Sequence, residues 1–431
     1  MICKNITIQN GRLLFAGQNA AALLRQYGSP LYLMDEDRIR ENCRTYYTAM
    51  KEAFGEAALP LYASKAASFK EIYRIVNSEH LGIDVVSCGE IYTAVQTGFP
   101  MEKAYFHSNN KTDEDIAFAI ENGIGYFVAD NEEEVRAVNT IAGQKGIRQP
   151  ILLRLTPGID THTYEAINTG KVDSKFGSAI ETGQAEAITK LALELPHIEL
   201  AGFHCHVGSQ VFDSDTFLRS AEIMLEFIAA IKAKYGYTAP QLDLGGGYGV
   251  RYLESDPVID IAENIREVAK FVKKKCAALG LPLPAIRMEP GRSIVADAGM
   301  TLYTVGTIKQ IPGYKNYVSV DGGMGDNPRF ALYGADYTIL AAEKMDERCD
   351  FECSVVGRCC ESGDIIQENV KLPASVKRGD ILAVLTTGAY NYSMASNYNR
   401  IPRLPVVMLK EGTSRIVVKR ESLFDIVRND L

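Results

Sequence analysis

The chain has 431 residues, of which 46% are hydrophobic and 23% are charged, a composition typical of a folded globular protein and not of a disordered one. Its 46 basic and 54 acidic side chains give a net charge of −8 and are scattered along the chain, so we expect no nucleic acid partner. The first residues lack a signal-peptide pattern and no apolar run reaches the roughly 18 residues of a membrane-spanning helix, so we expect a cytoplasmic protein without membrane association.

The length favours two domains, and the first segment already differs in pattern from the middle of the chain. Residues 5–17, "NITIQNGRLLFAG", predict a β-hairpin that turns at Asn10-Gly11. We expect residues 1–30 to join a β domain formed later in the chain. The nine cysteines contain no Cys-x-x-Cys pair, which predicts reduced thiols and not a disulfide framework or a zinc ribbon.

Residues 31–292 predict an α/β domain. Helical patterns such as 68–79, 89–98, 131–142 and 260–280 alternate with short apolar, β-branched runs that end in polar or glycine residues. An alternation of eight β and α units indicates a (β/α)8 barrel, and an open doubly wound sheet is disfavoured because its nucleotide fingerprint is missing. The eight predicted strands are "LPLYASKA", "GIDVVSCGE", "KAYFHSNNK", "GYFVADN", "PILLRLTPG", "LAGFHCHVGSQ", "QLDLGGGYG" and "AIRMEPGRS".

Residues 293–431 read differently, as strands separated by turns, with little helical pattern between them. We therefore predict a C-terminal all-β domain, a β-sandwich or β-barrel. Its expected strands include "MTLYTVGTIKQI", "YKNYVSVDGG", "FECSVVGRC", "DILAVLTTGAY" and "SRIVVKRES".

Polar residues at the ends of the predicted barrel strands are candidates for chemistry, because barrel active sites lie at the C-terminal face. Lys65 ends the first strand, where desolvation could make its amine a nucleophile, although a solvated surface lysine is the plainer reading. His204 and His206 stand two apart on the sixth strand and share a face. A metal pair lacks a third ligand, so histidines that contact a bound ring or simply fill the core remain open.

Strands seven and eight end in glycine-rich segments. The run Gly245-Gly246-Gly247 and the segment Gly291-Arg292 fall where barrels commonly hold phosphate, through backbone N–H groups and a guanidinium. Together with Lys65 and the carboxylate of Glu289, they form the set that pyridoxal 5′-phosphate requires. No metal is expected.

Seven ordered motifs make the sequence similar, over nearly its whole length, to a known family: "YASKA", "HVGSQ", "GGGYG", "EPGR", "DGGMGDNPRFALYGA", "CESGD" and "GAYNYSMASNYN". It resembles the barrel-type, fold type III pyridoxal-phosphate decarboxylases of basic amino acids. The resemblance implies an alanine-racemase-like architecture of barrel plus β domain. It also implies a homodimer, in which a loop with the "CESGD" motif completes the partner's active site.

The resemblance also implies roles for individual residues. Lys65 would hold the cofactor covalently and Glu289 would pair with its ring nitrogen, while His206 would stack on the ring. Cys360 of "CESGD" would donate the proton, with Cys359 as an extra neighbour. The remaining cofactor contacts implied are Ser209, Gly245, Gly246, Gly247, Gly291, Arg292 and Tyr390.

Within this family, the sequence is most similar to the branch that decarboxylates meso-2,6-diaminopimelate to L-lysine and CO₂, the last step of lysine biosynthesis. That substrate keeps an intact amino acid centre, which charge-assisted pairs can recognise. The implied substrate contacts are Arg292, Arg329, Tyr333, Glu361 and Tyr390. The alternatives are decarboxylation of D-ornithine, D-lysine or carboxynorspermidine, a catalytically dead regulator, and a racemase, which would need a tyrosine base from the partner.

Overall fold

The structure is a computed structural model that describes residues 2–159 and 174–431. The chain divides into two compact units. We call residues 42–249 and 258–291 the barrel unit, and residues 1–41, 250–257 and 292–431 the β unit. The β unit therefore includes 31–41 and 250–257, two segments from within the range 31–292 that we had expected to form the barrel.

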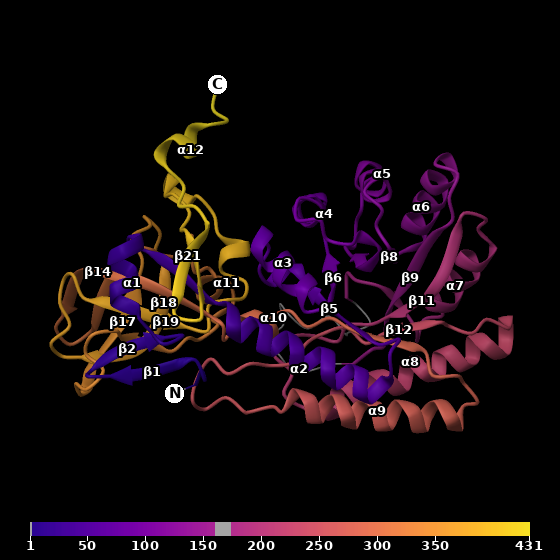
Figure 1. The fold of residues 1–431 in the computed structure, drawn as a ribbon, viewed down its shortest axis with the longest axis horizontal. Helices are drawn as coiled ribbons and strands as arrows, with labels where there is room; N and C mark the ends of the chain where they lie inside the picture. Colours follow the sequence, from indigo (N-terminus) through magenta and orange to yellow (C-terminus); the bar gives the residue numbers. More distant parts are fainter. Residues whose placement is uncertain (1, 160–173) are drawn as a thin grey trace. The chain divides into compact units, whose positions relative to one another are not determined.

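The barrel unit contains a closed parallel sheet (Figure 1). The eight strands are β5 (Leu59–Ala63), β6 (Gly82–Val85), β7 (Ala104–Phe106), β8 (Tyr126–Ala129), β9 (Gln149–Thr156), β11 (Ile198–His204), β12 (Gln241–Asp243) and β13 (Ala285–Met288). They follow the order β9-β11-β12-β13-β5-β6-β7-β8, and β8 pairs with β9 to close the ring. The short β10 (Ser178–Ala179) is added beside β9. This arrangement confirms the predicted (β/α)8 barrel.

Helices surround this sheet (Figure 1). They form because apolar residues recur at helical spacing and polar residues cap the first turn. In α3, for example, Ile72, Tyr73, Ile75 and Val76 are buried, and α5 begins with a capping box between Thr112 and Asp115. The helices are α3 (Lys70–Ser78), α4 (Cys88–Val95), α5 (Asp113–Glu121), α6 (Glu132–Gln144), α7 (Gln184–Glu194), α8 (Ser214–Tyr235) and α9 (Ile261–Ala278), after α2 (Glu36–Phe54).

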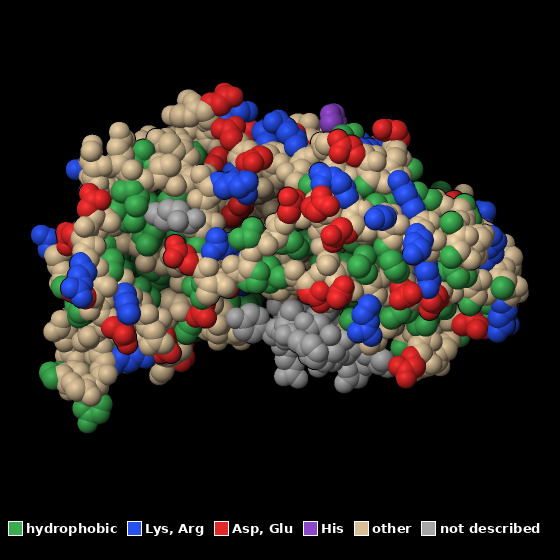
Figure 2. Space-filling model, turned by 90° about the horizontal axis from the view of Figure 1, so that it is seen from below, with side chains coloured by type: hydrophobic (Ala, Val, Ile, Leu, Met, Phe, Trp, Pro, Cys, Tyr) green, Lys and Arg blue, Asp and Glu red, His purple; other side chains and the backbone are tan. Residues whose placement is uncertain are grey.

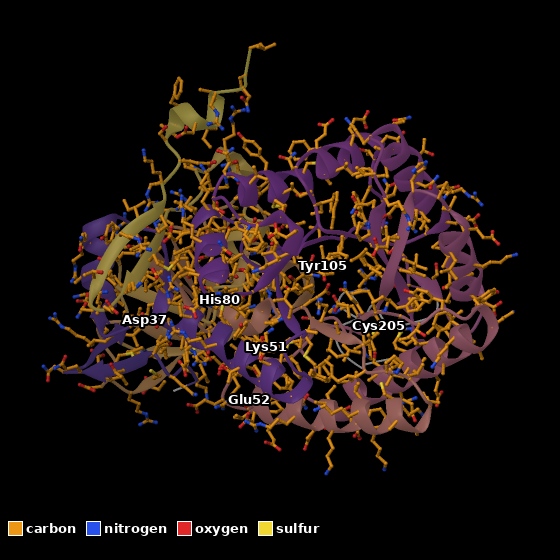
Figure 3. The ribbon with its side chains drawn as sticks, turned by 45° about the vertical axis from the view of Figure 1, so that its right-hand side comes forward. Asp37, Lys51, Glu52, His80, Tyr105 and Cys205 are labelled. Atoms are coloured by element: carbon orange, nitrogen blue, oxygen red, sulfur yellow. The ribbon has the colours of Figure 1, made fainter. Side chains whose placement is uncertain are left out.

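The Tyr105 hydroxyl, in the barrel core, both donates and accepts a hydrogen bond. The Tyr105 hydroxyl, on β7, donates to Gln241 at 2.8 Å and accepts from Arg287 Nε at 2.9 Å. Figure 3 labels Tyr105 and also Cys205, which follows β11 and contacts Ser220 of α8 at 3.2 Å. These bonds connect strands and helices at a depth where an unpaired polar group would cost about 1–3 kcal/mol.

The β unit contains a second sheet, in the order β18-β17-β15-β14-β4-β20-β21, in which β19 also pairs with β14 and β16 pairs with β19. The strand β4 (Leu31–Asp35) lies here because it pairs with β14 and β20, not with a barrel strand. The other strands are β14 (Gly299–Ile311), β15 (Lys315–Val320), β16 (Ile339–Ala341), β17 (Cys349–Val356), β18 (Ile365–Pro373), β19 (Ile381–Leu385), β20 (Val406–Lys410) and β21 (Thr413–Val418).

The predicted N-terminal hairpin is present in the β unit. β1 (Ile6–Gln9) and β2 (Arg12–Phe15) pair around Asn10 and Gly11, whose positive φ values of 51° and 70° suit a two-residue turn. β3 (Gln18–Asn19) completes this small sheet. The short helices of the unit are α1 (Ala20–Tyr27), α10 (Arg292–Val295), α11 (Arg329–Tyr333) and α12 (Leu423–Val427).

Acidic, basic and apolar side chains are interspersed on the face drawn in Figure 2, in line with the scattered charges of the sequence. Among the described residues, none of the helices is both long and apolar enough to cross a membrane.

Candidate active site

The predicted nucleophile lies directly after the first barrel strand. Lys65 is exposed, in a single 3₁₀ turn, Ser64–Ala66. Next to this turn, the Ala63 N–H donates to the Pro290 carbonyl at 3.0 Å, and a Cβ on Gly291 would lie 2.9 Å from the Ala63 Cβ. Gly291 thus allows the ends of the first and eighth strands to pack closely, so the lysine and the "EPG" segment share one side of the barrel's C-terminal face.

Two carboxyl groups near Lys65 have raised pKa values. Burial raises the pKa of Asp84 to about 6, with His107 opposing and Glu289 adding to the shift. Burial also raises the pKa of Glu90 to about 7, although a hydrogen bond from the Val86 N–H and the charge of Lys65 act against it. Raised carboxyl pKa values clustered at strand ends are typical of functional sites.

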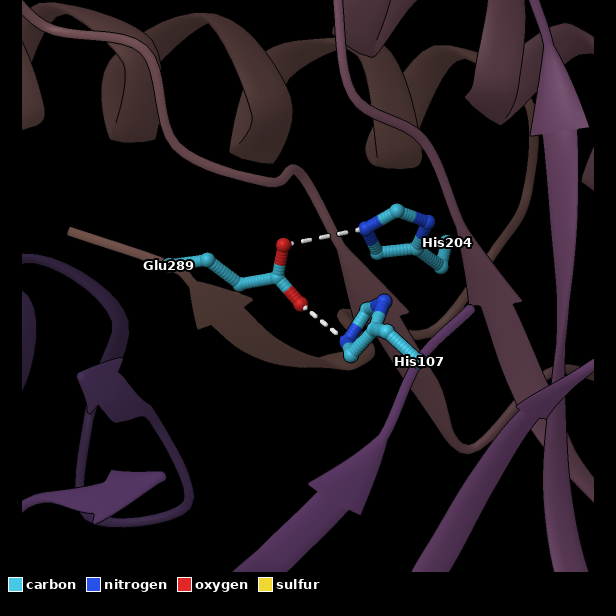
Figure 4. A group of neighbouring side chains, drawn as sticks. All are labelled: His107, His204 and Glu289. Atoms are coloured by element: carbon cyan, nitrogen blue, oxygen red, sulfur yellow. Dashed lines mark hydrogen bonds and ion pairs between the residues drawn. The ribbon is translucent and has the colours of Figure 1, made fainter. Parts of the chain in front are cut away.

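Glu289 lies between two imidazole rings (Figure 4). Its Oε1 is 2.7 Å from His107 Nε2, and its Oε2 is 3.1 Å from His204 Nε2. All three side chains are buried, with 6% or less of their surface exposed. Burial alone would raise the pKa of Glu289, but the two imidazoles outweigh it and hold that pKa well below its usual range.

The sequence analysis did not predict His107 as a site residue. Its position could have indicated it, because it is the first polar residue after β7 in "AYFHSNN". The sequence left His204 open between a core residue, a ring contact and a metal ligand. The structure places it against Glu289, with its ring 4.9 Å from that of His107 and at 71° to it.

His206 lies beside the glycine run. The Gly246 N–H donates to His206 Nδ1 at 3.3 Å, and the loop after β11 is tied to the run where the Val211 N–H donates to the Gly247 carbonyl at 2.9 Å. Ser209 is part of that loop and is half-buried. Burial, and next the charge of Lys65, lower the pKa of His206 well below its usual value, so its ring is neutral at pH 7.

No side chain larger than hydrogen fits in the glycine run. A Cβ would lie 2.5 Å from the Cys205 carbonyl oxygen at Gly245 and 2.1 Å from the Glu289 carbonyl oxygen at Gly246. Gly245 and Gly247 also have positive φ values of 68° and 125°. The glycines therefore let this segment pack closely against the segments that follow strands six and eight. Its place after strand seven is the place where the sequence predicts a phosphate cradle.

The β unit holds a second cluster, of arginines and tyrosines. Arg292, 6% exposed, donates to the Tyr252 hydroxyl at 2.9 Å and lies 4.7 Å from the Tyr390 ring. Arg329, 3% exposed, lies 4.7 Å from the Tyr252 ring and donates to the Tyr337 hydroxyl at 2.7 Å. Burial raises the Tyr252 pKa, but the two arginines outweigh it and lower that pKa overall.

The surroundings of Arg329 suit a bound anion. Its described contacts are with tyrosines, and its buried Nε has no hydrogen-bond partner. A buried guanidinium is stable only when its donors meet acceptors. Tyr252 and Tyr337 were not predicted, and only the nearness of Tyr252 to the glycine run in "GGGYGVRY" could have pointed to one of them.

The remaining predicted residues lie at loops and helix ends of the β unit. The Cys359 N–H donates to Asp364 at 2.6 Å, and the Cys360 N–H donates to Asn399 at 2.7 Å. Cys360 is exposed, whereas Cys359 is half-buried, and burial raises the pKa of Cys359 to about 11. Glu361 is exposed. Tyr333 ends α11, and its hydroxyl contacts the Met394 sulfur at 3.8 Å.

Comparisons with known proteins identify the family of this chain. The family model described as "Pyridoxal-dependent decarboxylase, pyridoxal binding domain" matches residues 36–296. Diaminopimelate decarboxylase of Bacillus subtilis is 45% identical over 98% of this chain and 96% of its own. The enzyme of that name from Staphylococcus aureus is 43% identical over 98% of both chains. A crystal structure of the diaminopimelate decarboxylase from M. jannaschii in co-complex with L-lysine has a TM-score of 0.92 at 31% identity, covering 100% of this chain and 98% of that one.

The chain belongs to the pyridoxal-dependent decarboxylases, which confirms the family expected from the seven motifs. Within that class, its family is that of the diaminopimelate decarboxylases. It is a carboxy-lyase whose cofactor is pyridoxal 5′-phosphate.

Proposed function

We propose that this chain removes one carboxylate of meso-2,6-diaminopimelate to give L-lysine and CO₂, the last step of lysine biosynthesis. The names of its relatives support this substrate, as does the L-lysine in the co-complex of the M. jannaschii enzyme. The observation that carries the proposal is the pair of buried arginines around Tyr252. A diamine-forming decarboxylase meets only an ammonium group at the distal end of its substrate and has little use for such a pair.

The residues at the barrel strand ends fit the cofactor. When bound, pyridoxal 5′-phosphate supplies an electron sink for the electron pair that the departing CO₂ leaves behind. Lys65 would hold the cofactor covalently, His206 would offer a neutral ring for stacking, and Glu289 would offer a carboxylate to the ring nitrogen. As phosphate-binding groups we propose Ser209, Gly245, Gly246, Gly247, Gly291 and Arg292, because the glycine run and Gly291-Arg292 follow strands seven and eight, where barrels commonly hold phosphate.

The β unit supplies substrate recognition. We assign the distal carboxylate to Arg292 and Arg329, since charge-assisted, forked contacts fix both position and chirality. Tyr333 supports that carboxylate, Glu361 pairs with the distal ammonium, and Tyr390 contacts cofactor and substrate. The stacking of Arg292 on Tyr390 supports a shared role for these two residues.

Cys360 is our candidate for the proton donor. A thiol is protonated at neutral pH yet acidic enough to give up a proton. Because Cys360 is exposed on a loop of its own β unit, we propose that it serves the site of a second copy in a cytoplasmic homodimer. Adjacent Cys359 raises the hypothesis of a vicinal disulfide or thiol oxidation that would silence the donor, and full activity after oxidant treatment would contradict it.

The test is to give meso-diaminopimelate to purified, cofactor-loaded protein and to measure CO₂ and L-lysine. L-ornithine, L-lysine, L-arginine and their D forms, and carboxynorspermidine, are assayed in parallel. Turnover of meso-diaminopimelate alone is the expected result. Turnover of one of the other substrates instead would overturn the substrate but keep the chemistry, and inertness toward all of them would favour a regulatory homologue.

A further inference from the structure

His107 and His204 both approach Glu289, although neither is among the residues proposed above to contact the cofactor. His204 comes from the end of β11 and His107 comes directly after β7, so two different strands direct an imidazole toward one carboxylate (Figure 4). The Nε2 of each ring approaches a different oxygen of Glu289, at 3.1 Å for His204 and 2.7 Å for His107, and only the His204 contact has the geometry of a hydrogen bond. Because a carboxylate only accepts hydrogen bonds, the 3.1 Å bond requires a proton on His204 Nε2.

The other nitrogen of His204 supports this tautomer. Its Nδ1 is buried and has no hydrogen-bond partner. A buried N–H without an acceptor costs the full desolvation of that donor, so a ring protonated at Nε2 alone is favoured. Burial also lowers the pKa of His204, which keeps the ring neutral. His204 is therefore a fixed donor to Glu289.

Glu289 differs from the other carboxyl groups close to it. Burial raises the pKa of Asp84 to about 6, and it raises that of Asp243 well above its usual value, with Glu289 adding to both shifts. Glu289 is buried like these two, and of the three it alone is flanked by two imidazoles at 3.1 Å or less. His107 also faces Asp84, at the longer distance of 3.9 Å.

We propose that His107 and His204 are positioning residues that hold Glu289 as an oriented carboxylate, so that the proton shared between Glu289 and the cofactor stays on the ring nitrogen. This inference deepens the proposed function and rests on its assignment of Glu289. A buried carboxyl without these neighbours takes up a proton readily. With the His204 donor and the adjacent His107 ring in place, the anion is held in one orientation, and the proton remains on the cofactor, where it strengthens the electron sink.

Two other readings predict different behaviour. If the histidines only fill the core, replacing them changes folding or cofactor affinity but not the position of the proton. If the three side chains, whose ligand atoms lie within 4.8 Å of one another, are a metal site, the apo protein binds Zn²⁺ stoichiometrically through them. Spectroscopy and Zn²⁺ binding distinguish both interpretations from the proposal.

The first measurement is infrared spectroscopy of the apo protein, which needs neither cofactor nor substrate. Glu289→Gln should remove no carboxylic acid C=O band from the wild type, because Glu289 is ionised there. In His204→Phe and in His107→Phe, the same change should remove such a band. In His204→Gln and His107→Gln, which keep a side-chain N–H near the position of Nε2, no band should be removed. The matched control is His80→Asn, at an exposed histidine whose φ of 64° asparagine tolerates.

The second measurement is the ¹⁵N resonance of ring-labelled cofactor in the loaded protein. The wild type and the Gln variants should show the protonated-pyridine shift, and the Phe variants should move toward the neutral-pyridine shift. The proposal is overturned if Glu289→Gln removes an acid band from the wild type, if the Phe variants keep the wild-type resonance, or if Zn²⁺ binds tightly and the binding is lost in the Gln variants.

Misfolding and failure of the substrate assignment are both distinguishable from these outcomes. If the Phe variants do not fold, the comparison of wild type with Glu289→Gln still decides whether Glu289 is ionised. If wild type binds cofactor but does not turn over meso-diaminopimelate, the substrate is wrong, while the infrared and ¹⁵N results stand unaffected.

Discussion

The two units differ in how their buried charged side chains are surrounded. In the barrel unit, Glu289 is compensated from within by His107 and His204. In the β unit, Arg329 is packed among tyrosine rings, and its Nε has no hydrogen-bond partner. A buried cation with an unused donor can bind an anion that a ligand supplies, whereas a carboxylate already flanked by protein groups needs no such ligand. This difference matches our proposal that the barrel unit holds the cofactor and that the β unit selects the substrate.

The largest effect is expected for loss of the cofactor-binding lysine of the barrel unit. Lys65→Ala removes the amine that holds the cofactor, so we expect loss of the absorbance band of covalently bound cofactor and a fall in kcat of about 10³-fold or more. Lys70→Ala, at an exposed lysine five residues further along, is the control and should keep both. An unchanged spectrum in Lys65→Ala would remove this lysine from its role.

Cys360→Ala tests the chemical contribution of the β unit. Loss of a positioned acid should lower kcat by about 10²-fold, while the cofactor absorbance and the KM stay near wild type. Cys349→Ala, at another exposed cysteine of the β unit, should have no effect. Equal activity of the two variants would show that the proton comes from elsewhere.

Arg329→Gln tests substrate selection by the β unit. Losing charge-assisted bonds worth about 1.5–3 kcal/mol should raise KM for meso-diaminopimelate roughly tenfold to hundredfold, with the cofactor spectrum unchanged. Arg378→Gln, at an exposed arginine that donates to the Gly306 carbonyl, is the matched control. A changed cofactor spectrum with an unchanged KM would show that Arg329 contacts the cofactor and not the substrate.

The smallest expected effect is on stability. Because folding raises the pKa of Glu90 from 4.5 to about 7, the folded state holds a proton that the unfolded state has lost between these pH values. Its stabilising contribution is therefore full below about pH 4.5 and falls as pH rises to 7.

Glu90→Gln should accordingly raise the melting temperature at pH 8 relative to wild type by a few degrees, on the order of 1 kcal/mol, and have little effect at pH 5. Thermal unfolding of the cofactor-loaded protein at the two pH values measures this, with the exposed Glu102→Gln as control. An equal shift at both pH values would mean that the ionisation of Glu90 is not the cause.

Local patterns in the sequence were enough to predict the barrel, because strand and helix periods alternate and polar residues mark the strand ends. They could not show that β4, "LYLMD", belongs to the other sheet, since a buried strand reads the same whichever partner it has. Its neighbours β14 and β20 are distant in the chain.

The same limit applies to the site. Lys65, Glu289 and the glycine run could be predicted as candidates because position after a strand and residue type together indicate a role. His107 and Tyr252 were not predicted, since what distinguishes them is their contacts across strands and segments. No local period encodes such contacts.

The placement of β4 has a consequence for biosynthesis. In the folded protein, Leu31, Leu33 and Met34 are buried, and Tyr32 is paired with Val406. A ribosome that adds roughly 5–20 residues per second needs about 20–75 s to reach that partner. β14 emerges earlier, but the edge of β4 that pairs with β20 stays open throughout this interval, and the β unit cannot close its sheet until translation is nearly complete.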